Sequence, residues 1–168
     1  MKTHTPRFLF ALGLALPLAL ATGPLQAAET HGHGHEHEPP AALTLNHGQK
    51  WATDEPLRQA MGDLRQAVAQ ALPEAHAGSL PEAGYDALGK QANRELAHIV
   101  ENCKLEPQAD AALHVILADV VAGADIAGGR EAGQPRAAGV VRLAEALNRY
   151  GAYFDHPGWQ DIPVPHES

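Results

Sequence analysis

Apolar residues recur at three- and four-residue steps in four successive segments of this chain, and this spacing constrains the fold more than any other feature. A helix places such residues on one face, which has to be buried against another element. The segments run from Asp54 to Leu72, from Ser79 to Cys103, from Pro107 to Gly128 and from Pro135 to Gly151. Because the alternation typical of strands is missing, the pattern predicts an all-α fold.

Proline and capping residues mark the expected ends of the first two helices. Asp54 is a suitable N-cap, and Pro73 is expected to end the first helix at Leu72 because proline interrupts helical hydrogen bonding. Ser79 and Glu82 have the spacing of a capping box, which predicts the start of the second helix.

The expected inward faces consist of large apolar residues and alanines. They are Leu57, Met61, Leu64, Val68 and Leu72; Tyr85, Leu88, Ala92, Leu96, Ile99 and Cys103; Leu113, Ile116, Leu117, Val120 and Ala124; and Val140, Val141, Leu143, Ala144 and Leu147. Short or Gly-rich connections favour antiparallel neighbours, so we expect an antiparallel up-down-up-down four-helix bundle over residues 43–155. Two helical hairpins that pair between chains would bury the same faces.

Residues 1–28 have the features of a secretory signal peptide. Lys2 and Arg7 precede the apolar run 8–20, which is shorter than the about 20 residues that a membrane-spanning helix needs. Small residues follow, so we expect cleavage near Ala27 or Ala28. The mature protein is then expected in the periplasm, without a membrane anchor, as a monomer or homodimer.

The charge balance excludes some classes of partner and activity. The formal net charge is −8, and loss of Lys2 and Arg7 makes it more negative. Nucleic-acid binding requires a basic face, so we expect no nucleic-acid partner. The chain has no nucleophile elbow, phosphate-binding glycine loop or zinc-protease motif. We therefore predict that the protein is not an enzyme.

Residues 29–42 are expected to form a flexible, disordered tail. His31, His33, His35 and His37 occupy every second position beside two glutamates, with no apolar side chain to bury. Imidazoles suit copper, zinc and other transition metals. The pattern favours metal capture by this tail, and an inert linker is the alternative.

The expected topology also brings scattered residues to one end of the bundle. A rise of about 1.5 Å per residue places Met61, His98 and His114 at similar heights, with Cys103 nearer the rim and His156 emerging at the same end. Thioether, thiol and imidazole together suit copper better than calcium or magnesium, and zinc has little use for a Met.

We therefore predict a copper site of Met61, His98, Cys103 and His114, whose use would be copper handling or electron transfer with a periplasmic redox or metal-transfer partner. His98 and His114 are each one residue away from the inward faces. The single cysteine of the chain cannot form an intramolecular disulfide.

The four helices, the signal peptide and Met61 in the first helix resemble the periplasmic four-helix cytochromes of the soluble cytochrome b type. In that family a Met of helix one and a His of helix four bind haem. Residues 147–153 offer no His for the second ligand, and the Cys-x-x-Cys-His motif of the related cytochromes c-prime is missing. The resemblance implies the fold more than the cofactor, and haem ranks below copper, as zinc does.

Residues 45–58 and 101–107 also resemble an uncharacterised group of exported bacterial proteins, which implies no activity. Residues 156–168 contain three prolines and are expected to form an extended C-terminal tail, with Trp159 either shielding the metal site or docking on the surface. Beside the metal-binding hypothesis, a non-metal helical adaptor of the cell envelope and a haem-binding cytochrome remain as alternatives.

Overall fold

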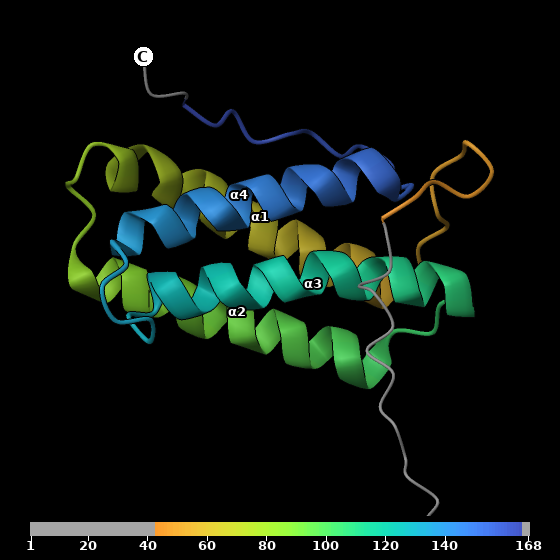
Figure 1. Ribbon diagram of the computed structural model, residues 1–168, viewed down its shortest axis with the longest axis horizontal. Coiled ribbons are helices and arrows are strands. Elements are labelled where there is room, and N and C mark those ends of the chain that lie inside the picture. The colour runs from red at the N-terminus through yellow and green to blue at the C-terminus, as the bar shows by residue number, and fades with distance from the viewer. Residues whose placement is uncertain (1–42, 166–168) are drawn as a thin grey trace, which may run out of the picture. The chain divides into compact units, whose positions relative to one another are not determined.

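The computed structural model describes residues 43–165. The predicted signal peptide and the histidine-rich tail lie outside these described residues. Between residues 43 and 165 the chain forms four α-helices and no β-strand (Figure 1). The helices are α1 (Glu55–His76), α2 (Glu82–Asn102), α3 (Pro107–Ala127) and α4 (Arg136–Tyr153). The all-α prediction is confirmed.

Each helix packs against the next one in the chain, and α1 also packs against α4, so that the four helices surround a common core. The chain reverses direction at each connection (Figure 1). An ion pair between Asp86 of α2 and Arg136 of α4 joins the N-terminal parts of these two helices. Within the described residues, no helix combines the length and apolar character needed to cross a membrane.

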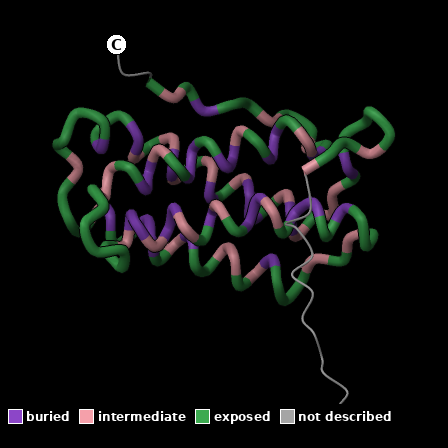
Figure 2. The backbone as a smooth tube through the Cα atoms, viewed as in Figure 1, coloured by how far each residue is buried: buried purple, intermediate pink, exposed green. Residues whose placement is uncertain are grey.

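The predicted apolar faces form the core (Figure 2). The predicted residues of α1 and α3 are all buried, and those of α2 and α4 are buried apart from Leu96, Cys103 and Val141, which are partly buried. Burial of apolar surface is the main favourable term in folding, so these stripes explain why the helices associate.

The α1 helix does not end at Leu72 as predicted, because it continues through Pro73 to His76. Pro73 lies in the last turn, where its fixed φ is compatible with a helix and only one hydrogen bond is lost. The N–H of Ala77 then donates to the carbonyl of Pro73 at 3.0 Å and closes the helix.

The predicted capping box of α2 is wrong. The N-cap of α2 is Pro81, which makes no side-chain capping bond. The Ser79 hydroxyl instead donates to the carbonyl of Glu74 at 3.3 Å. Ser79 therefore stabilises the end of α1 rather than the start of α2, because the turn between the helices brings it back to α1.

Residues after α4 return along the bundle. Asn148 of α4 accepts from the N–H of Ile162 at 2.8 Å and donates to the carbonyl of Ile162 at 2.9 Å. Ile162 is buried. The C-terminal residues up to 165 are therefore packed against the helices.

Two glycines allow the close approach of α3 and α4, which make the most extensive contact between any two helices. A Cβ atom at Gly139 would lie 2.3 Å from the nitrogen of Ala127 and 2.6 Å from the carbonyl oxygen of Gly123. The backbone of α3 thus occupies the space that a side chain at Gly139 of α4 would need.

We expect Gly139→Ala to destabilise the protein by about 1–3 kcal/mol, because the helices would have to move apart. The matched control is Gly62→Ala in α1, where an added Cβ meets nothing within 4 Å. That substitution should stabilise the protein by about 0.5–1 kcal/mol through helix propensity. Urea unfolding followed by circular dichroism measures both, and equal effects would contradict the close-approach explanation.

Candidate functional site

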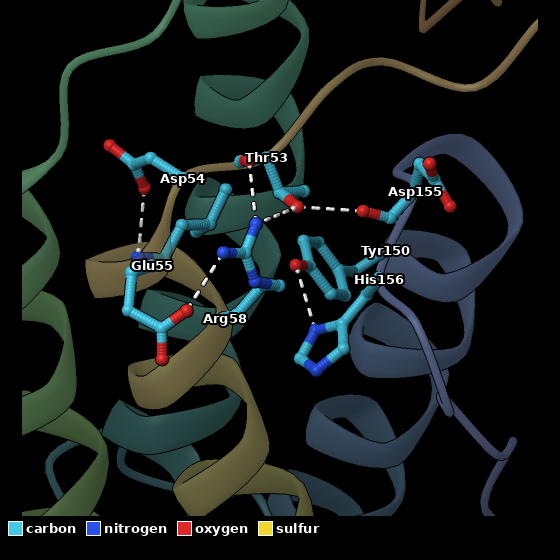
Figure 3. Close-up of polar contacts among 8 residues, drawn as sticks. Thr53, Asp54, Glu55, Arg58, Tyr150, Asp155 and His156 are labelled. Carbon is cyan, nitrogen blue, oxygen red and sulfur yellow. Dashed lines mark hydrogen bonds and ion pairs between the residues drawn. The ribbon is translucent and has the colours of Figure 1, made fainter.

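Polar side chains gather where the lead-in segment, residues 43–53, meets the end of α4. The N–H of Trp51 donates to the carbonyl of Tyr153 and the N–H of Asp155 donates to the carbonyl of Trp51, both at 2.8 Å. The Thr53 hydroxyl donates to the carbonyl of Asp155 at 2.6 Å (Figure 3). These bonds fix the entry of the chain into α1 next to the exit from α4.

Asp54 joins α1 to the connection between α2 and α3. One carboxylate oxygen accepts from the N–H of Leu57 at 3.0 Å and caps α1. The other accepts from the N–H of Lys104 at 2.6 Å, just after α2 ends. A negative charge at this place also interacts favourably with the N-terminal dipole of α1. One side chain therefore positions two helix ends.

Cys103 lies beside this carboxylate and is partly buried. Burial raises the pKa of the Cys103 thiol to about 12, and the negative charges of Asp54 and Asp110 add to this effect. The thiolate is the form that binds metals and acts as a nucleophile. These surroundings instead favour the neutral thiol.

Arg58 lies in the first turn of α1. Its guanidinium donates to the carbonyl of Thr53 at 2.7 Å and to the Thr53 hydroxyl at 3.1 Å. It also forms an ion pair with Glu55 at 2.7 Å (Figure 3). The cation is thus held beside the end of α4.

Tyr150 and His156 form a hydrogen-bonded pair at this end. Tyr150 is fully buried, and its hydroxyl oxygen lies 3.1 Å from Nδ1 of His156 (Figure 3). Burial raises the pKa of the Tyr150 phenol. Burial lowers the pKa of His156, and the charge of Arg58 lowers it further against the opposite effect of Glu55. A protonated phenol therefore faces a neutral imidazole at pH 7.

Trp159 covers this pair. Its ring centroid lies 4.8 Å from that of Tyr150 and 4.9 Å from that of His156. The guanidinium of Arg65 lies 5.9 Å from the Trp159 ring centroid. A Cβ atom at Gly151 would lie 2.2 Å from the indole nitrogen, so only glycine leaves room for the ring.

The four bundle residues predicted to bind copper have different surroundings. Met61 is completely buried in the core. His98 is partly buried, with Nε2 enclosed and without a hydrogen-bond partner. The His114 side chain is 67% exposed, and its Nδ1 lies 2.9 Å from the carbonyl oxygen of Asp110. Asp110 lies one turn before His114 on α3, and its negative charge raises the pKa of the Cys103 thiol.

Among residues 43–165, no three His, Cys, Asp or Glu side chains form a group that could hold a metal ion. The structure therefore does not bring His98, Cys103 and His114 together as three ligands. The copper site of these residues and Met61 stays a prediction. The tail histidines His31, His33, His35 and His37 lie outside the described residues.

The arrangement does not fit the haem ligation that the cytochrome resemblance implies. A haem iron bound by Met and His needs both side chains on one cavity. Met61 lies in the packed core, whereas His114 faces outward from α3 and Nε2 of His98 is enclosed.

A broad hollow lies along α4, away from these residues. Asp119 of α3 occupies one side of it and pairs with Arg142, at 2.8 Å, and with Arg149. Burial opposes ionisation of Asp119, but the two arginines outweigh it and lower its pKa. The charges there are already compensated within the chain and indicate no specific ligand.

Comparison with protein-family models, with curated proteins and with solved structures finds no match for this chain. The function has to be argued from the chemistry of the residues themselves.

The sequence predicts some of the polar residues that gather where residues 43–53 meet the end of α4, here called the polar end of the bundle. Asp54 is predicted only as a helix cap, and His156 is predicted to emerge at this end. The same topology, applied to Tyr150 and Arg58, would have placed both residues here, because Tyr150 is in the last turn of α4 and Arg58 in the first turn of α1. Neither residue belongs to a recognisable motif.

We expect Asp54→Asn to increase the rate at which Cys103 reacts with a disulfide reagent at pH 8 by about fivefold. Loss of one screened charge lowers the thiol pKa and is worth about 1 kcal/mol. Asparagine keeps one acceptor oxygen for the N–H of Leu57 and gives up the bond to Lys104, so the helix cap and the fold should be retained. Asp63→Asn, an exposed acid of α1, is the control, and equal rates in both variants would contradict the effect of Asp54 on the thiol.

Proposed function

We propose that this is an exported, periplasmic metal-binding protein that captures copper through the imidazoles of His31, His33, His35 and His37. The single observation that carries the proposal is the sequence of this segment, in which four histidines alternate with other residues; one glutamate lies between the last two histidines and a second follows them. An antiparallel helical bundle would then serve as the carrier of the binding segment.

The chemistry of the segment favours copper. Unperturbed imidazoles are mostly neutral at pH 7, and the neutral form is the ligand. For a site of nitrogen ligands, the affinity for divalent metals rises to a maximum at Cu²⁺ and falls again at Zn²⁺. Four imidazoles within seven consecutive residues can reach one ion without a folded scaffold. Binding of Cu²⁺ is therefore expected to exceed binding of Zn²⁺.

The surroundings of Cys103 support the assignment of copper to the tail. A thiolate close to copper is readily oxidised, whereas a partly buried neutral thiol is a poor ligand and a poor reductant. Burial and the charge of Asp54 favour this neutral form. In the metal-free protein the thiol is therefore a weaker candidate ligand than the imidazoles of the tail.

A non-metal adaptor of the cell envelope is the second candidate. It is favoured by the apolar side chains Val100 and Val121, which are 77% and 44% exposed on α2 and α3. Exposed apolar patches occur at protein-protein contacts, although single exposed residues are common. The metal titration below separates the two candidates.

We expect the mature protein to bind Cu²⁺ stoichiometrically in a calorimetric titration. Replacement of His31, His33, His35 and His37 by Asn should weaken binding by about 100-fold or more, which corresponds to about 2.7 kcal/mol or more of lost ligand interaction. Cys103→Ser and His114→Asn are the matched controls in the bundle and should preserve the affinity.

Full binding by the tail variant would contradict the proposal. Loss of binding in the Cys103→Ser variant would instead support the copper site predicted in the bundle. No binding by the unmodified protein would favour the adaptor.

A further inference from the structure

Residues 155–165 follow α4 and are here called the C-terminal strap. Its first residues are held at the end of α4 by three kinds of contact. The backbone of Asp155 bonds to Trp51 and Thr53, His156 bonds to Tyr150, and Trp159 packs on Tyr150. Only the contact through His156 involves a group that titrates near neutral pH.

The Tyr150 hydroxyl makes the closing of the strap depend on the protonation of His156. In the described part of the chain, the only hydrogen-bond partner of this buried hydroxyl is Nδ1 of His156. Neutral His156 can accept the phenolic proton. Protonated His156 carries a hydrogen on Nδ1, so the hydroxyl has to turn and its own proton is left without an acceptor. A buried donor without an acceptor is unfavourable, because its lost hydrogen bond to water is not replaced.

Burial and the charge of Arg58 also favour the neutral imidazole. Arg58 of α1 opposes a second positive charge, and Glu55 of α1 favours it. Burial between the rings of Tyr150 and Trp159 removes water from the imidazole. Burial and Arg58 together outweigh Glu55, so the pKa of His156 is lowered in the closed structure. The other titratable groups around the pair, which act on Tyr150, are Asp54, Cys103 and Asp155.

We propose that His156 is a pH-sensitive latch, which holds residues 156–159 against the end of the bundle while its imidazole is neutral and releases them when it is protonated. The strap stays attached on both sides of these residues through contacts that do not titrate near neutral pH. These are the backbone bonds of Asp155, the bond from Arg65 to the carbonyl of Gln160, and the bonds between Ile162 and Asn148. Release is therefore local. It uncovers the face of Tyr150 that Trp159 covers in the closed structure.

The direction of the pH dependence follows from the lowered pKa. The released strap has an imidazole of ordinary pKa, 6.5, and the closed strap has a lower one. The closed form thus binds fewer protons, and its stabilisation is complete above pH 6.5. It decreases as the pH falls through this value towards the pKa of the closed form. This inference is independent of metal binding by the tail.

The indole N–H groups of the two tryptophans report on the latch in the mature protein. The indole nitrogen of Trp159 is buried without a hydrogen-bond partner, whereas that of Trp51 donates to the carbonyl of Thr44 at 2.7 Å. We expect the solvent-exchange protection factor of the Trp159 indole, measured by NMR, to fall several-fold from pH 7.5 to pH 5. Protection of Trp51 should not change.

The variant that tests the role of His156 is His156→Asn, whose amide oxygen can accept from Tyr150 and does not titrate. It should keep Trp159 protected at both pH values. His76→Asn, at the far end of α1, is the matched control and should respond as the unmodified protein does. Circular dichroism verifies that each variant is folded, and His156→Gln replaces any His156→Asn protein that is not.

Three results would overturn the latch. The first is equal protection of Trp159 at both pH values in the unmodified protein. The second is a pH response that persists when residue 156 no longer titrates. The third is a joint loss of protection at Trp51 and Trp159, because this would mean unfolding of the whole end of the bundle.

Discussion

Each of the four amphipathic helices has an apolar face that must be buried, and the rest of the structure depends on this constraint. None of the helices can bury its face alone, and the hydrophobic effect favours the arrangement in which all four share one core. The starts of α1 and α3 and the ends of α2 and α4 then meet at one place. Asp54, Cys103 and Tyr150, which are far apart in the sequence, become neighbours there. The polar end of the bundle is therefore a consequence of core formation.

Much of the fold follows from local patterns, and the failures have identifiable physical reasons. Spacing alone identifies the core residues of α1 and α3. It does not show that α1 passes Pro73, because a proline in a last turn loses only one bond. Ser79 has the right spacing for a capping box, but the turn brings its hydroxyl to Glu74. Such outcomes depend on tertiary contacts, which override local preferences.

The candidate site shows the same difference between what local spacing predicts and what tertiary contacts decide. Heights counted along helices bring residues to one end, but they do not give the direction of a side chain around its axis. His114 is on the turn expected of it and faces outward, whereas Met61 faces the core. The charge of Asp54 beside Cys103 changes the chemistry of the thiol in a way that no spacing indicates. In the account proposed here, the tail supplies the metal chemistry, and the bundle shields its thiol and holds a titratable strap.

The central claim is that copper is bound by imidazoles of the tail and not by the thiol of the bundle. Electron paramagnetic resonance and absorption spectra of the mature protein, loaded with one equivalent of Cu²⁺, test it most directly. The account predicts hyperfine coupling to several imidazole nitrogens and no thiolate-to-copper charge-transfer band. An intense charge-transfer band that disappears in Cys103→Ser would contradict it, as would a spectrum of unbound aqueous Cu²⁺.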